Sequence, residues 1–360
     1  GTSVADVDHI RSVAAHVKRE VDGGHACAVV VSAMAGATNQ LVALVEQAWG
    51  FKEQKANGGD PAQSAEYDGR EYDAVVSSGE QVTSGLLALV LQSLGVKARS
   101  WQGWQIPLHT DAAHRAARIT GLDVHEIKGR MLAGEVAVVA GFQGIAPGNR
   151  VSTLGRGGSD TTAVALAAAL FADICEIYSD VDGVYSADPR IVPNAKRVEQ
   201  ITYEEMLELA ASGAKILHLR AVEYARRSNI PLRVRSSYST RPGTLVTGSM
   251  EDLPVEQALI TGVAHDRSEA KVTALAVPDE PGQAAELFRV VAEAEINIDM
   301  IVQNISTKGN GRTDISFTLP KDDGPTAMAA LQKAKEQIGF TGLLYDDHIG
   351  KVSLVGAGMR

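Results

Sequence analysis

The stretch "ACAVVVSAM" (residues 26–34) is a continuous apolar run, rich in valine, that ends in small and polar residues. Such a run is typical of a β-strand buried on both faces of a sheet. Similar runs recur at 72–80, 135–144, 172–180 and, more weakly, 230–236. Apolar residues recur at helical spacing in the segments that precede and separate these runs, at 7–22, 81–94, 161–171 and 203–227. Strands that alternate with helices predict an α/β fold, an open αβα sandwich around a mainly parallel sheet.

The composition is that of a soluble globular protein with a sizeable core. The chain has 360 residues, 45% hydrophobic and 22% charged, and its net charge is -10. The charge argues against nucleic acid as a partner, because a phosphate-binding surface favours excess Lys and Arg. Cys27 and Cys175 lie in apolar runs, so we expect reduced core residues. No run approaches ~20 consecutive apolar residues and no signal peptide is found, so we expect no membrane partner and a cytoplasmic location.

A second domain is expected after an acidic, proline-containing break at 246–258. Beyond the break the pattern predicts the order βαββαβ of a ferredoxin-like domain. The predicted bounds are 271–277, 282–294, 296–304, 312–319, 325–337 and 341–346. Apolar and polar residues alternate through "INIDMIVQN" (296–304), so we expect one apolar and one polar face along that strand.

The stretch "STLGRGGSDTTAVALAAAL" (152–170) places glycines, Arg156 and Asp160 before a helix that is apolar on every side. Ser159 and Asp160 suit the N-cap of that helix, and a buried helix N-terminus attracts anions. Glycines at 155, 157 and 158 let a ligand touch the backbone, and Arg156 can bind a carboxylate or phosphate in bidentate fashion. The alternative is a structural cap beside a surface arginine. The loop is no dinucleotide fingerprint, since Asp160 stands where the third glycine belongs.

Four further segments are candidate ligand contacts, because ligands bind beyond the carboxyl ends of parallel strands. "YSDVDGVYSADPR" (178–190) favours a nucleotide pocket, with a solvated turn as the alternative. Glu80 ends the run at 72–80, before a helix, although it could serve only to complement the helix dipole. Lys215 follows a helix, where a lone lysine is usually solvated. Ser32, at the end of the run at 26–34, and Thr38, beyond it, supply hydroxyls.

Together these residues resemble the aspartate kinases, the amino-acid kinases that open the lysine, threonine and methionine pathway. The motifs "TLGRGGSDTTA", "SDVDGVYSADPR" and "INIDMIVQN" carry the resemblance, which extends over essentially the whole chain. It implies the amino-acid kinase fold and ATP-dependent phosphorylation of the side-chain carboxylate of L-aspartate. It also implies Mg²⁺ as cofactor, with no metal ligand from the protein.

The resemblance implies roles for individual residues. Arg156 would grip a substrate carboxylate and Asp160 would organise the reacting centre, as the catalytic pair, while Glu80 would hold the substrate ammonium. The other implied substrate contacts are Ser32, Thr38, Gly157, Gly158 and Ser159. The implied ATP contacts are Gly1, Ser179, Asp180, Tyr185, Arg190 and Lys215.

The C-terminal part resembles the ACT modules of the same family, which bind end-product amino acids. Lysine and threonine are therefore the expected inhibitors, and a homo-oligomer or an α2β2 assembly through ACT domains is implied. The implied effector contacts are Asp279, Pro281, Gly282, Gln283, Asn297, Ile298, Gln303 and Asn304. We accordingly divide the chain into a kinase domain at 1–248, a linker with a first ACT domain at 249–346, and the start of a second ACT domain at 347–360.

The chain departs from the family pattern at both ends. The family's Lys-Phe-Gly-Gly-Thr-Ser motif, whose Lys meets the ATP phosphates, is present here from its second Gly, at Gly1. The second ACT module is present only as its first strand. We therefore expect the chain as printed to have little kinase activity.

Two other functions stay open at this point. One is a different amino-acid kinase, acting on acetylglutamate or a nucleoside monophosphate; the Arg156 and Glu80 pair, suited to a zwitterion, and the βαββαβ tail disfavour it. The other is an amino-acid sensor that has lost catalysis. For the aspartate reaction no general base is needed, because a carboxyl with an unperturbed pKa of about 3.9 is already ionised at neutral pH, and no histidine is assigned a role.

Overall fold

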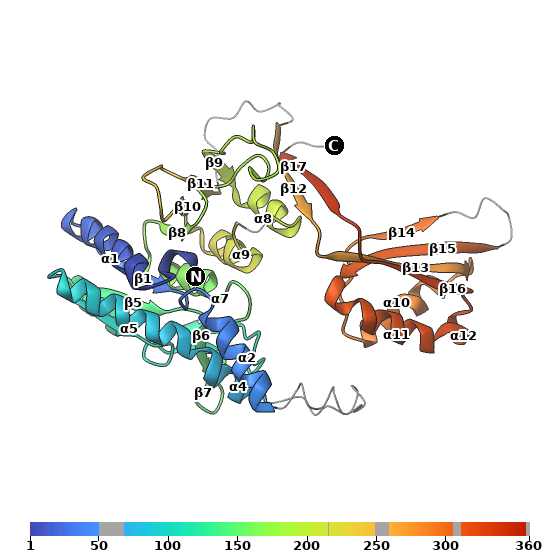
Figure 1. Ribbon diagram of the computed structural model, residues 1–360, viewed down its shortest axis with the longest axis horizontal. Helices are drawn as coiled ribbons and strands as arrows, with labels where there is room; N and C mark the ends of the chain where they lie inside the picture. The colour runs from blue at the N-terminus through green and yellow to red at the C-terminus, as the bar shows by residue number, and fades with distance from the viewer. Residues whose placement is uncertain (50–67, 215, 249–258, 305–310, 358–360) are drawn as a thin grey trace. The chain divides into compact units, whose positions relative to one another are not determined.

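The computed structural model describes residues 1–49, 68–214, 216–248, 259–304 and 311–357 (Figure 1). The chain divides into two compact units. The first comprises Gly1–Ala211, Lys215–Gly262 and Val355–Arg360, and the second Ser212–Ala214 and Val263–Leu354.

The first unit is built around a parallel sheet with strand order β1-β5-β2. These strands are β1 (Ala28–Val31), β5 (Val136–Ala140) and β2 (Ala98–Trp101). The central strand β5 is buried at every position, and its side chains alternate between two apolar clusters. Val136 and Val138 face the helices α1 (Val7–Asp22) and α5 (Ser78–Ser93), whereas Val139 packs with residues of α6 (His125–Leu132) and α7 (Gly158–Leu170).

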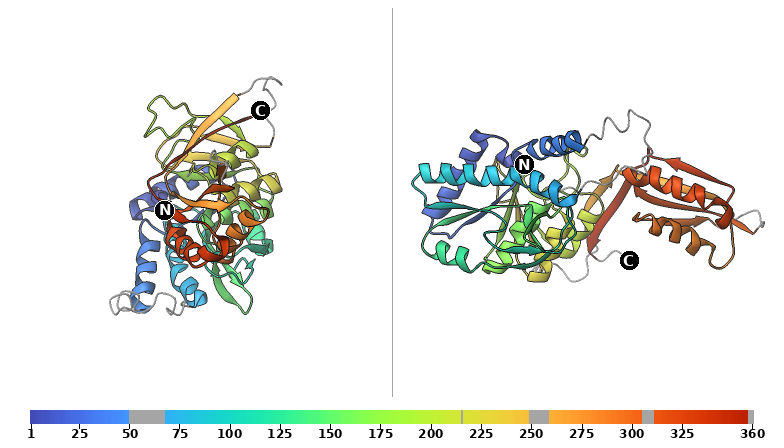
Figure 2. Two further views of the ribbon diagram at one scale, coloured as in Figure 1. Left: turned by 90° about the vertical axis from the view of Figure 1, so that its right-hand side faces the viewer. Right: turned by 90° about the horizontal axis from the view of Figure 1, so that it is seen from below.

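Helices therefore cover both faces of this sheet, as the ribbon views show (Figure 2). This arrangement confirms the αβα sandwich. Two further sheets complete the unit, in the orders β8-β10-β11-β9 and β4-β3-β6-β7. Their strands are β8 (Cys175–Ser179), β10 (Leu232–Ser236), β11 (Thr244–Thr247), β9 (Gln200–Thr202), β4 (Ile119–Leu122), β3 (Leu108–Thr110), β6 (Gln143–Ala146) and β7 (Arg150–Thr153). The remaining helices are η1 (Thr2–Val4), α2 (Ala37–Trp49), α4 (Gly69–Val76), α8 (Tyr203–Ala211) and α9 (Leu219–Ser228).

The strand predicted at 72–80 is wrong, because the segment forms the end of α4 and the start of α5. Asp68 caps α4 by accepting a hydrogen bond from the backbone N–H of Arg70 at 2.9 Å. The buried residues recur at helical spacing: Asp73, Val76, Ser77, Glu80, Thr83, Ser84 and Leu87. The helix predicted at 203–227 is two helices, α8 and α9, and between them Gly213 adopts a left-handed φ of 103°.

Among the described helices, Gly69–Ser93 is long and apolar enough to cross a membrane by length and composition alone. Half of its most apolar window is buried inside the unit. It packs against α1 and β2, as a core helix does.

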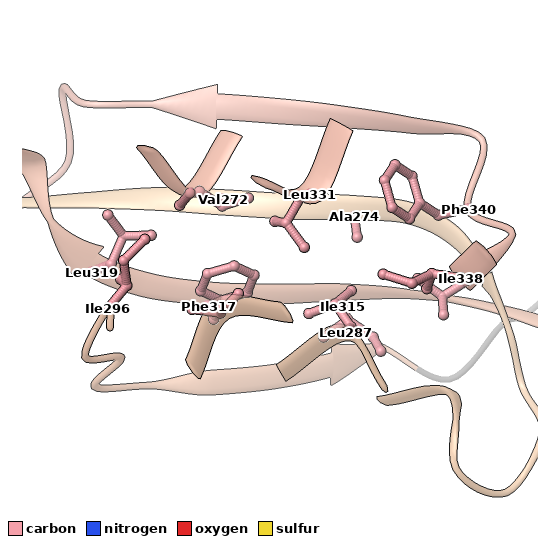
Figure 3. Packing of buried hydrophobic residues seen from close by; sticks show 13 residues of the cluster. Val272, Ala274, Leu287, Ile296, Ile315, Phe317, Leu319, Leu331, Ile338 and Phe340 are labelled. Carbon is pink, nitrogen blue, oxygen red and sulfur yellow. The ribbon is translucent and has the colours of Figure 1, made fainter. Parts of the chain in front are cut away.

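The second unit holds an antiparallel sheet with strand order β14-β15-β13-β16. The strands are β13 (Glu269–Pro278), β14 (Ile301–Asn304), β15 (Arg312–Pro320) and β16 (Gly342–Asp346). The helices are α10 (Gln283–Glu293), η3 (Lys321–Asp323), α11 (Gly324–Lys333) and α12 (Lys335–Ile338). Leu287 of α10 and Leu331 of α11 pack against Val272 and Phe317 of the sheet (Figure 3). The βαββαβ order is confirmed. β12 (Leu259–Asp266) and β17 (Lys351–Ala357) pair in a separate two-stranded sheet.

The strand predicted at 296–304 is shorter than expected, since β14 begins at Ile301. Ile296 and Ile298 pack with the core cluster, but Met300 is 46% and Val302 44% exposed. The predicted alternation therefore fails beyond Ile298. β14 is an edge strand, which pairs with β15 on one side within the described sheet.

Candidate active site

A cavity of about 1200 Å³ lies in the first unit, lined by Gly1 and by residues of the segments 32–39, 69–80, 114–116, 142–160 and by His218. Ser32 directly follows β1, and Phe142 lies two residues beyond β5, so the cavity lies at the carboxyl ends of the parallel strands. The lining includes the whole set of predicted substrate and catalytic residues: Ser32, Thr38, Glu80, Arg156, Gly157, Gly158, Ser159 and Asp160. Segments far apart in the sequence thus form one site.

The glycine loop brings the N-terminus of α7 to the cavity. Gly157 is the N-cap and adopts a left-handed φ of 69°. A Cβ on Gly157 would lie 2.0 Å from Cγ of His218, and a Cβ on Gly158 would lie 2.7 Å from Cδ2 of Phe142. Side chains at these two positions would therefore collide with the cavity wall. The predicted N-cap at Ser159 and Asp160 is wrong by two to three residues, because the glycine fits where His218 packs.

Glu80 lies in the first turn of α5 and is only 4% exposed. Its Oε1 accepts a hydrogen bond from the backbone N–H of Ala33 at 3.0 Å. Its Oε2 is buried and has no partner among the described residues. Burial raises the pKa of Glu80 to about 7, against the opposing effect of the Ala33 N–H. A buried carboxylate oxygen without a partner, in a residue that lines the cavity, fits a ligand cation.

Asp160 and Arg156 bring opposite charges to the same loop. Burial raises the pKa of Asp160, and His218 opposes that shift. Arg156 is exposed where the loop borders the cavity. The lining thus offers Glu80 and Asp160 for cationic groups and Arg156 for an anionic one, the pattern that an amino-dicarboxylate would require.

Most of the predicted nucleotide contacts lie apart from the residues that line this cavity. Among the described residues predicted to contact ATP, only Gly1 lines the cavity. Ser179 ends β8 and accepts from the backbone N–H of Val181 at 3.2 Å, and Asp180 follows it at the surface. Tyr185 forms an isolated bridge with Arg197. The guanidinium of Arg190 donates to Asp188 at 2.8 Å. Lys215 lies outside the described residues.

A group of polar residues on the cavity wall was not predicted from the sequence. Tyr72, His114, Arg115 and Thr153 line the cavity, and Asp73 lies behind them, fully buried. His218 was missed as well. Isolated His and Asp residues have no motif spacing, so the only available signal was the helical period that carries Asp73 and Glu80 on one face.

The predicted effector residues all belong to the second unit but fall into two groups. Asp279, Pro281, Gly282 and Gln283 follow the end of β13, where Pro278 pairs with Arg312. Asn297 and Ile298 lie near the other end of β15, since the backbone N–H of Asp299 donates to Thr318. The two groups are roughly 20 Å apart along β15 at the rise of an antiparallel strand. Gln303 and Asn304 pair with Ile315 and Asp314, nearer the first group.

Comparisons with known proteins agree with this arrangement. The model of the "Amino acid kinase family" matches residues 1–236, and an "ACT domain" model matches residues 274–334. An aspartokinase of Mycolicibacterium smegmatis is 52% identical over 361 residues, which cover 100% of this chain and 82% of the relative.

Two solved structures of E. coli aspartokinase III are similar over nearly the whole chain. The complex with aspartate and ADP (R-state) is 29% identical, with a TM-score of 0.77, and the match covers 99% of this chain and 86% of that one. The complex with lysine and aspartate (T-state) is 28% identical, with a TM-score of 0.71, and the match covers 99% and 85%.

Proposed function

The chain belongs to the aspartokinases of the amino acid kinase family, and from that premise we propose that it transfers the γ-phosphoryl group of ATP to the side-chain carboxylate of L-aspartate. The observation that carries the proposal is the cavity in which Glu80, Arg156 and the N-terminus of α7 meet. A relative that binds aspartate and ADP supports it.

The substrate is held by complementary charges. The buried Oε2 of Glu80 receives the substrate ammonium, which supplies the partner that this oxygen lacks. Arg156 pairs with a substrate carboxylate. Ser32, Thr38 and Ser159 add polar groups of the lining. An analogue without an ammonium would leave the Glu80 charge buried and unpaired, so the site prefers amino acids.

The reaction then requires positioning and charge neutralisation rather than proton abstraction. The attacking carboxylate is already ionised at neutral pH, because its unperturbed pKa is about 3.9. Its approach to the anionic phosphates is opposed by repulsion, which backbone N–H groups at a helix N-terminus reduce. The 13-residue helix α7 offers that terminus at the cavity, and Gly157 and Gly158 let phosphate oxygens approach its backbone.

ATP is proposed to act with Mg²⁺, held by the phosphates rather than by a protein cage. The residues fit such an ion, because the partly buried carboxylate of Asp160 lies in the first turn of α7 where the cavity meets the glycine loop. Bound Mg²⁺ would supply neutralisation of the phosphate charge. The nucleotide contacts proposed outside the cavity remain Ser179, Asp180, Tyr185, Arg190 and Lys215. A cytoplasmic location is part of this proposal.

The second unit is proposed to regulate the first in response to end-product amino acids. Its ACT match and the lysine complex of E. coli aspartokinase III support lysine as an effector, and we propose threonine as a second one. The effector contacts proposed are the eight residues of 279–304 named above. Because they form two groups in one module, we propose that a site is completed by two modules in an oligomer. We keep the domain bounds 1–248, 249–346 and 347–360 as part of this proposal.

The test is ADP release by the full-length enzyme with aspartate, acetylglutamate or UMP as acceptor, each with and without Mg²⁺. We expect turnover with aspartate alone, dependent on Mg²⁺ and reduced by lysine, threonine or both. Turnover with acetylglutamate or UMP but not aspartate would refute the substrate assignment. Binding of lysine without any turnover would instead support the amino-acid sensor.

A further inference from the structure

A buried carboxylate holds one wall of the cavity in place. Asp73 of α4 is 0% exposed. Its Oδ1 accepts from the hydroxyl of Thr153 at 2.6 Å, and its Oδ2 accepts from Nδ1 of His114 at 2.7 Å. The backbone N–H of Arg115 donates to both oxygens, at 3.2 and 3.1 Å. We call these four residues the Asp73 cluster. Three segments that are distant in sequence are thus joined at one buried group.

This geometry fixes the orientation of the His114 ring. A carboxylate has acceptors only, so Nδ1 of His114 carries the hydrogen of the bond to Asp73. In the neutral ring, Nε2 is then an acceptor. The His114 side chain is 14% exposed and lines the cavity. On its other side, Gly69 is so near that a Cβ there would lie 3.0 Å from Cβ of His114. The bond to Asp73 therefore orients the imidazole, and Gly69 leaves room for the Cβ of His114.

The backbone beside His114 is strained. Arg115 adopts a φ of 70°, a left-handed conformation that is rare for residues other than Gly, Asn and Asp. Such strain persists where surrounding structure enforces it, and it concentrates at functional sites. Here the enforcing contact is the pair of hydrogen bonds from the Arg115 N–H to Asp73.

We propose that His114 is a further substrate-contacting residue, whose Nε2 accepts a hydrogen bond from the substrate ammonium, and that Asp73 is the positioning residue behind it. The inference rests on the proposed function, because it assigns the ligand as an amino acid. Glu80 and Asp73 lie on consecutive helices that meet at Ser77, and both helices contribute to the cavity wall. The ammonium would then have two partners, the carboxylate of Glu80 and the imidazole of His114.

Two variants of His114 separate contact from support. In His114→Asn the amide N–H stands near the position of Nδ1 and can still donate to Asp73, but no atom remains at Nε2. In His114→Gln an amide oxygen reaches the Nε2 position. We expect the Asn variant to raise the aspartate KM about tenfold or more, about 1.4 kcal/mol or more, with the ATP KM and the Tm unchanged. The Gln variant should recover part of that loss.

Succinate identifies the group that is contacted, because it has both carboxylates of aspartate but no ammonium. As a competitive inhibitor its Ki should be the same for the wild type and His114→Asn. Asp73→Asn should raise the aspartate KM and also lower the Tm, since an amide mismatches three donors. The control is His109→Asn, at an exposed histidine of β3 outside the cavity lining, with wild-type constants expected.

The outcomes distinguish this inference from the proposed function. Aspartate binding is measured by calorimetry without ATP, in parallel with turnover. If the wild type binds aspartate but releases no ADP, the proposed function fails, while the binding series still tests His114. A wild-type aspartate affinity in His114→Asn, or an equal loss for aspartate and succinate, overturns the His114 assignment even where the wild type is an active aspartokinase. Absence of aspartate binding by the wild type overturns both.

Discussion

Replacing Glu80 by Gln should make the enzyme more stable and at the same time weaken its hold on aspartate. Glu80 is 4% exposed, its Oε2 has no partner, and burial raises its pKa from 4.5 to about 7. Between these two values the folded state binds the proton more tightly than the unfolded state. The free energy of unfolding of the wild type therefore falls as the pH rises through this window, and the loss is complete above about pH 7.

The magnitude follows from the size of the shift. At about 1.36 kcal/mol per pKa unit, the buried charge costs the empty enzyme up to about 3 kcal/mol at pH 8. Gln carries no charge, so Glu80→Gln should lack this decline and unfold at a higher temperature than the wild type at pH 8. Without the carboxylate, the substrate ammonium loses a charge-assisted hydrogen bond of about 1.5–3 kcal/mol, or roughly 10- to 150-fold in the aspartate KM.

The assay combines thermal unfolding from pH 5 to 8 with aspartate affinity over the same range. The wild-type aspartate KM should fall about tenfold per pH unit up to about pH 7 and then level off, since binding requires the ionised Glu80. Calorimetry without nucleotide excludes titration of ATP as the cause. Glu208→Gln, at an exposed glutamate of α8, is the matched control. An aspartate affinity that is flat with pH, or a Gln variant with a wild-type KM, would refute the reasoning.

Three further changes test other parts of the molecule. Arg156→Ala should raise the aspartate KM about 30-fold or more, because the site loses a charge paired with the substrate carboxylate (roughly 2–5 kcal/mol). The ATP KM should stay within about threefold, and steady-state kinetics measure both constants. Gly157→Ala places a Cβ 2.0 Å from His218 on a left-handed backbone, so kcat/KM should drop at least about tenfold. The control is Gly24→Ala, where the backbone is also left-handed but no atom lies within 4 Å of the new Cβ, so only stability should change. Leu331→Ala should destabilise the second unit by about 2–5 kcal/mol and abolish the lysine response before turnover is lost, as followed by differential scanning calorimetry and inhibition curves.

Regular elements with strong local signals could be predicted from the sequence. The helix at 7–22 matches α1 residue for residue, because Asp6 caps it by accepting from the backbone N–H of His9 and Ile10, Ala14 and Val17 form one buried stripe. The run at 135–144 contains β5, whose valines suit a strand that is buried on both faces. In the second unit, the six elements were predicted in the correct order, because each is short and amphipathic.

Where local and tertiary signals compete, the sequence prediction is wrong. The Val-Val pair of 72–80 favours a strand locally, but the segment belongs to α4 and α5, whose helical period buries Asp73, Val76 and Glu80. The preference of Ser159 and Asp160 for an N-cap gives way to Gly157, because His218 packs from 61 residues downstream against a position that only glycine can occupy. The contacts of His218 and of the Asp73 cluster join separate segments, so no local motif marks them.

Burial of the acidic residues connects the fold of the cavity to its selectivity. The helical register that places Glu80 inside the unit also removes its charge from water, which raises its pKa to about 7. A ligand that brings its own ammonium relieves that cost, whereas a simple dicarboxylate brings only negative charge and leaves Glu80 unpaired. Discrimination against a ligand that lacks a required hydrogen-bonding group can reach about 10⁴-fold in sites of this kind. Mutations that expose Glu80 to water should therefore relax the preference for amino acids before they abolish binding, because they lower the cost of leaving its charge unpaired.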